Sequence, residues 1–139
     1  MPRIVATASF LPAVLLSLAS LTTPACQTSR PPRAPETFDD VYEHRESLRD
    51  SVITLHGAYM GWNGSECVFP AYAALQATRS DWILKIGETC LYVTGGSPPG
   101  LSAMEETPAG QRVSLEVRVR VNPGGRILLE YVRTVPVSD

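Results

Sequence analysis

Two histidines, His44 and His56, are the only side chains of this sequence whose ordinary pKa lies near neutral pH. Nucleophilic catalysis needs a nucleophile, a base and an orienting group within hydrogen-bond reach of one another. No local motif marks either histidine as such a base, and neither stands at a zinc-ligand spacing from Cys67 or Cys90. We therefore expect no catalytic residues, no metal and no cofactor, and we expect that the protein is not an enzyme.

A polar segment beside an aromatic residue gives a second candidate site, centred on Arg79 and Asp81. One interpretation makes these two side chains polar contacts for a sugar or peptide that lies against Tyr92 or Trp62. The other makes them the cap of a strand end, with Trp82 filling the interior of the fold. The sequence favours the second interpretation, and the first stays as the alternative, a ligand site of Arg79, Asp81 and Tyr92.

The residues before Cys26 have the layout of an export signal. A basic start at Arg3 is followed by an uncharged, mostly apolar run over residues 7–21. This run is shorter than the roughly 20 apolar residues of a membrane-spanning helix, and Pro12 interrupts it. It therefore predicts a removable signal, not a permanent span.

Small residues stand directly before Cys26 (Ala25) and three before it (Thr23), and in this the segment resembles a bacterial lipobox. The resemblance implies that Cys26 carries a diacylglycerol and an acylated amino terminus, so that the mature protein meets the membrane through a lipid anchor. Gln27 is not the aspartate associated with inner-membrane retention, which favours the outer membrane of the cell envelope. The alternative is an ordinary secretory signal cut after Ala25, giving a secreted or periplasmic soluble protein with Cys26 as a plain thiol.

Cys67 and Cys90 remain as an even pair in an oxidising compartment. A disulfide between them is the expected arrangement, and two unpaired buried thiols are the alternative.

The mature chain of about 114 residues has room for one domain. The predicted organisation is a signal peptide over 1–25, a flexible proline-rich tether over 26–36, an amphipathic helix over 37–50 and a β-barrel over 51–135. Thr37 and Asp40 form a capping box at the helix start, and a helical turn near Met104 is a further expectation.

From Ser51 onward the hydrophobic period is two, which is typical of strands. The expected strands are 52–62, 81–86, 89–94, 111–121 and 126–132, with a hairpin turn at Gly87-Glu88 and bends at Gly57 and Gly61. This order resembles an OB-fold, so the expected fold class is all-β, a small five-stranded OB-like barrel preceded by one short helix. A seven-stranded sandwich is the alternative, and it needs more strands than these.

The formal charge of −2, with both signs interspersed, argues against a nucleic-acid partner. We therefore expect a membrane-anchored, non-catalytic binding or interaction module of the bacterial cell envelope, with an envelope protein or a glycan as partner. The alternatives are a cell-envelope hydrolase that uses His56 and a structural subunit of an envelope complex.

Overall fold

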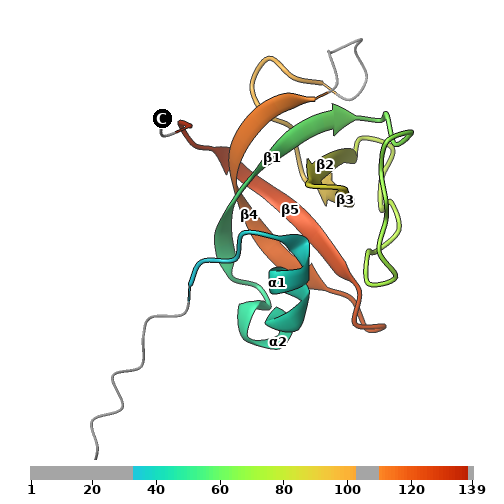
Figure 1. Ribbon diagram of the computed structural model, residues 1–139, viewed down its shortest axis with the longest axis vertical. Helices are drawn as coiled ribbons and strands as arrows, with labels where there is room; N and C mark the ends of the chain where they lie inside the picture. The colour runs from blue at the N-terminus through green and yellow to red at the C-terminus, as the bar shows by residue number, and fades with distance from the viewer. Residues whose placement is uncertain (1–32, 103–109, 138–139) are drawn as a thin grey trace, which may run out of the picture. The chain divides into compact units, whose positions relative to one another are not determined.

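A computed structural model describes residues 33–102 and 110–137 of the chain (Figure 1). The predicted signal peptide, the predicted lipid attachment at Cys26, most of the predicted tether and the helical turn expected near Met104 lie outside the described residues. Strands β1 (Val52–Gly61), β2 (Trp82–Ile86), β3 (Thr89–Thr94), β4 (Gln111–Val121) and β5 (Ile127–Thr134) follow two short helices, α1 (Phe38–Glu43) and α2 (Arg45–Leu48).

The five strands form one closed barrel in the order β1-β2-β3-β5-β4. Neighbours are antiparallel except β3 and β5, which run parallel because the connection from β3 crosses to β4 before the chain returns as β5. The predicted all-β, five-stranded, OB-like barrel is confirmed.

The interior follows from the two-residue period of the strands. Trp82 and Leu84 of β2 point inward, as do Leu91 and Val93 of β3, and Tyr59 of β1 packs its ring 4.8 Å from that of Trp82. On β4 the alternation buries Val113, Leu115, Val117 and Val119. These alternating apolar side chains form one continuous core.

The single helix expected from the sequence is divided in two at His44, whose backbone (φ −103°, ψ 16°) leaves the helical region. The capping box is present, since the Thr37 hydroxyl accepts from the Asp40 amide and the Asp40 carboxylate accepts from the Thr37 amide. Phe38 and Val41 of α1 are buried in the barrel's core cluster, so α1 closes part of the interior.

Gly57 allows β1 and β2 to approach closely. A Cβ atom at this position would lie 2.6 Å from the carbonyl oxygen of Lys85, which is closer than real Cβ atoms come to an oxygen. Farther along β1 the register with β2 shifts between Tyr59 and Gly61, and Gly61 adopts φ +58°. The irregularity of β1 thus falls at Gly61, one of the two expected bends, whereas Gly57 is required by the close approach of β2.

The seam between β3 and β5 is short, with only Val93 and Thr94 in register with β5. The loop from Trp62 to Asp81 continues the seam, because Val68 bridges to Thr89 of β3 and Ala73 bridges to Ile127 of β5. This loop is therefore part of the barrel wall as well as a connection (Figure 1).

Candidate functional site

A second, smaller apolar cluster lies on the outer side of β1, β2 and β3. Met60, Ile83 and Cys90 are buried there, with Ala58, Cys67 and Tyr92 packed around them. Ile83 reaches this face because it is flanked in β2 by the inward-pointing Trp82 and Leu84. The outer face is thus apolar enough to hold the 62–81 loop against the barrel.

The 62–81 loop is fastened to the barrel by contacts along its length. The predicted disulfide is present between Cys67 on the loop and Cys90 on β3. Two residues farther along both segments, the ring of Phe69 stacks on that of Tyr92 with centroids 5.0 Å apart. The loop's next aromatic residue, Tyr72, stacks on Tyr42 of α1 at 4.4 Å. These contacts give a surface built on the loop a fixed position, which a binding site requires.

A hollow of about 350 Å³ lies between the start and the end of this loop, and we call it the aromatic pocket. It is lined by Trp62, Gln76, Arg79, Ile83 and Tyr92. Trp62 is 48% exposed, although its indole Nε1 donates a 2.9 Å hydrogen bond to the carbonyl of Asp81. The hydrogen bond fixes an aromatic ring that remains open to solvent. Such a ring beside polar donors is typical of small-ligand sites.

Asp81 organises this pocket from within and does not face a ligand. Its side chain is fully buried, and its carboxylate accepts from the amides of Ala77 and Thr78 at 2.6 and 2.8 Å and from the Thr78 hydroxyl at 2.5 Å. Burial acts to raise the pKa of Asp81, but these hydrogen bonds, with one from Thr94, outweigh it and lower the pKa. Asp81 therefore supports the pocket in two ways. Its carboxylate holds the Gln76–Arg79 turn in place, and its backbone carbonyl holds the ring of Trp62 in place.

The other two residues of the alternative ligand site, Arg79 and Tyr92, are brought together in the aromatic pocket. Arg79 is exposed, and its side chain makes no hydrogen bond or ion pair with any residue in the described ranges. Trp82, the neighbour of Asp81, is fully buried in the barrel and donates from Nε1 to the Gly96 carbonyl at 2.7 Å. The two tryptophans thus occupy opposite sides of the barrel wall.

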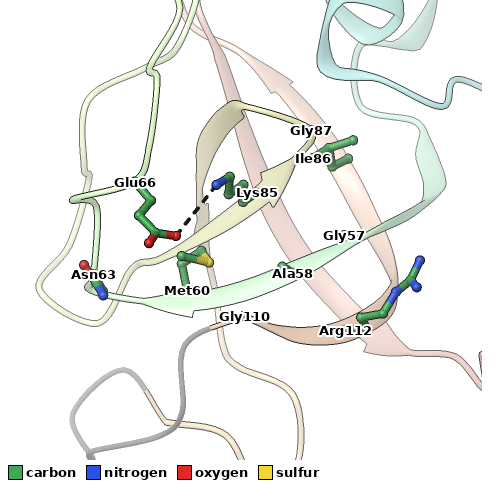
Figure 2. Close-up of a pocket in the computed structure, with 10 residues that line it drawn as sticks. All are labelled: Gly57, Ala58, Met60, Asn63, Glu66, Lys85, Ile86, Gly87, Gly110 and Arg112. Atoms are coloured by element: carbon green, nitrogen blue, oxygen red, sulfur yellow. Dashed lines mark ion pairs between the residues drawn. The ribbon is translucent and has the colours of Figure 1, made fainter.

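A second hollow of about 450 Å³, which we call the cationic pocket, lies on the same outer face (Figure 2). It is lined by Gly57, Ala58, Met60, Asn63, Glu66, Lys85, Ile86, Gly87, Gly110 and Arg112. Lys85 and Glu66 approach each other at one side of this pocket, with Nζ and Oε2 4.0 Å apart, and Arg112 lies at the other side. Sequence reasoning missed Gln76, because its place depends on how the 62–81 loop folds, and it missed Lys85 and Arg112, because theirs depends on which strands are neighbours.

Neither His56 nor His44 lines either pocket, although His56 directly precedes Gly57 of the cationic pocket. His44 is exposed at the junction of the helices, where its Nδ1 lies 2.9 Å from the Asp40 carbonyl oxygen. His56 stands opposite Ser114 in the β1–β4 register, and its Nδ1 lies 2.5 Å from the Ser114 hydroxyl. Ser114 is buried on the outer face of β4, an exception to the predicted alternation of that strand.

No protein-family model, curated protein or solved structure matches the chain. Within residues 33–102 and 110–137, no group of three His, Cys, Asp or Glu side chains is placed to hold a metal ion. In the same ranges no helix has the length and apolar character needed to cross a membrane. The candidate function therefore depends on the geometry of the two pockets.

Proposed function

We propose that this protein is a non-catalytic binding module of the bacterial cell envelope, tethered to a membrane by a lipid on Cys26, which takes a glycan in the aromatic pocket. The observation that carries the proposal is Trp62, a half-exposed aromatic ring held in place by its hydrogen bond to the Asp81 carbonyl. An ordered ring loses little conformational freedom when a ligand binds, which favours affinity.

The chemistry of the pocket supports a sugar as ligand. The rings of Trp62 and Tyr92 offer apolar faces for a sugar ring, while Arg79 and Gln76 offer hydrogen-bond donors for its hydroxyl groups. The volume of about 350 Å³ lies in the range of small-molecule sites, which is about 300 to 1,000 Å³.

Glycan-array binding of the purified full-length protein tests this proposal. We expect Trp62→Ala to lower binding to any glycan that the wild type retains by at least tenfold, and Arg79→Gln to lower it less. Val132→Ala is the matched control, because Val132 is also an exposed apolar side chain (39%) but lies on β5, outside the aromatic pocket. Equal retention by wild type and Trp62→Ala would refute the glycan site.

The lipid anchor is tested separately by the intact mass of the native protein. We expect the mass of the chain from Cys26 plus two or three acyl chains. An unmodified chain that begins at Cys26 would refute the anchor and leave the pocket proposal standing.

A second candidate function, a subunit of an envelope complex, is favoured by apolar side chains on the same loop. Val68 (60% exposed), Phe69 (37%) and Leu75 (77%) all face solvent there. Exposed apolar side chains gathered on one segment mark protein–protein contacts when they form a patch. Capture of one stable protein partner by the wild type and its loss in Leu75→Asp would favour this function.

The hydrolase alternative has one observation in its favour, the close contact of Ser114 with His56. Ser114 is 1% exposed, so its hydroxyl is covered by the histidine and not presented to a substrate. Neither residue lines the aromatic or the cationic pocket. A hydrolytic activity that is abolished by His56→Ala would nevertheless overturn the non-catalytic proposal.

A further inference from the structure

We propose that the cationic pocket is a second binding site, which holds a phosphate ester group over Ala58 between Lys85 and Arg112. The proposal is independent of the glycan site. It concerns a different hollow, different side chains and a different ligand chemistry.

The register of the sheet brings the two cations together. Ala58 of β1 is paired on one side with Lys85 of β2 and on the other with Arg112 of β4. Directly paired residues project from the same face of a sheet, and neighbouring strands lie about 4.8 Å apart. The Cα atoms of Lys85 and Arg112 are therefore about 10 Å apart with only a methyl group between them. Figure 2 shows the Lys85 side chain directed toward Glu66 and the Arg112 side chain directed away from Lys85. Both side chains are long and have to turn toward Ala58 to hold an anion there.

Lys85 is a mostly covered cation without a close partner. Its side chain is 19% exposed, and its ion-pair partner Glu66 lies at 4.0 Å, beyond the 2.7–2.9 Å of a charge-assisted hydrogen bond. The Glu66 side chain is itself 74% exposed and therefore well solvated. Covering an ammonium group is costly unless it is paired, so this lysine is suited to an anion that enters the pocket.

Arg112, at the other side of the pocket, is exposed and makes no side-chain hydrogen bond or ion pair with the residues that the structure describes. Two other arginines of the barrel, Arg120 and Arg133, are paired closely with carboxylates. Arg120 contacts Asp50 and Glu130 at 2.6 and 2.7 Å, and Arg133 contacts Glu116 at 2.6 Å. Lys85 and Arg112 thus lack the close carboxylate partners that Arg120 and Arg133 have.

The arrangement fits a phosphate better than a carboxylate. Ammonium and guanidinium groups are donors only, and here they belong to strands on the two opposite sides of Ala58. A tetrahedral phosphate directs oxygens to both sides at once, whereas a carboxylate pairs best with a single guanidinium fork. The side chains of Met60 and Ile86 line the remainder of the pocket, whose 450 Å³ exceeds the needs of a bare anion. We therefore assign an ester that carries an organic group, from a soluble molecule or a lipid headgroup.

The test is calorimetric titration of glycerol phosphate into the full-length protein, held in a non-ionic detergent that contains no phosphate group. We expect saturable binding that Lys85→Gln and Arg112→Gln each weaken by at least tenfold, which corresponds to the loss of one charge-assisted hydrogen bond. Glu66→Gln removes the competing carboxylate and should strengthen binding about two- to fivefold. Because a gain cannot arise from misfolding, this variant decides the outcome even if Lys85→Gln is unstable.

Arg79→Gln is the matched control, since Arg79 is an exposed arginine of the neighbouring pocket, likewise without an ion pair within the described ranges. It should leave the phosphate affinity unchanged. Absence of binding, equal weakening by Arg79→Gln, or no gain in Glu66→Gln would each overturn the proposal.

Discs of phosphatidylglycerol separate the two sources of the ester. A lower apparent affinity there in the wild type, but not in Arg112→Gln, would assign the site to a lipid headgroup. An unchanged affinity would assign it to a soluble ester. Loss of glycan binding in Trp62→Ala with intact phosphate binding would show that the two sites are separate.

Discussion

Trp82 and Trp62 stand at the two ends of the same loop and represent two different regions of this molecule. Each donates its indole N–H to a backbone carbonyl, but Trp82 is fully buried among apolar side chains, whereas Trp62 is 48% exposed. The interior of the barrel uses its aromatic residue for packing, and the outer face presents its aromatic residue to solvent. The comparison teaches that the hydrogen bond orders both rings, and that burial alone decides which ring stabilises the fold and which is available to a ligand.

The largest expected effect is that of Trp82→Ala, which should lower the free energy of unfolding by about 3–5 kcal/mol because it empties a large volume of the core. Trp62→Ala should lower the free energy of unfolding by about 1 kcal/mol, because it removes one hydrogen bond and a partly buried ring. Urea unfolding followed by circular dichroism measures both. Equal losses of unfolding free energy in Trp82→Ala and Trp62→Ala would contradict the distinction between the two regions.

Removal of the disulfide should come next, because it joins the loop to the barrel. Cys67→Ala combined with Cys90→Ala should cost about 3 kcal/mol, from the entropy of closing a loop of about 24 residues in the unfolded chain. The barrel should remain folded while glycan binding at the aromatic pocket weakens. Wild-type protein under reducing conditions should behave in the same way, and full retention of glycan affinity by both would contradict a role of the disulfide in positioning the loop.

Asp81→Asn tests the comparison at the boundary between the barrel interior and the outer face. The folded-state pKa of Asp81 is lowered from its ordinary 3.8, since its hydrogen bonds outweigh the opposing effect of burial. Its carboxylate therefore stabilises the fold above that ordinary value, and this stabilisation is lost as the pH falls through the lower folded-state pKa.

We accordingly expect Asp81→Asn to cost about 1–3 kcal/mol at neutral pH and progressively less below pH 3.8. Unfolding free energies of variant and wild type across pH 2–7 measure the difference. A gap that stays constant over this range would show that the charge of Asp81 is not what matters.

The smallest expected effect concerns the helix that closes part of the barrel interior. Thr37→Ala removes one half of the capping box and should cost about 1 kcal/mol. Thermal unfolding would show a small shift, with ligand binding at the outer face unchanged. Thr37→Ser retains the hydroxyl and is the matched control.

The sequence by itself determined the strands and the helix cap, and it favoured the pairing of Cys67 with Cys90. Strict alternation over residues 111–121, turn residues at Gly87-Glu88 and the spacing of Thr37 and Asp40 are local patterns, and local patterns follow from backbone geometry. The division of the helix at His44 was missed, because helix ends depend on packing as well as on propensity.

Only the tertiary structure decided what the outer face contains. Arg79 and Tyr92 were named from the sequence, but their meeting with Trp62 depends on how the 62–81 loop folds back over the barrel. Lys85 and Arg112 are 27 positions apart in the sequence, and only the pairing of both with Ala58 makes them neighbours. Sequence periodicity tells which side of a strand a residue occupies, whereas strand order and register tell which residues share that side.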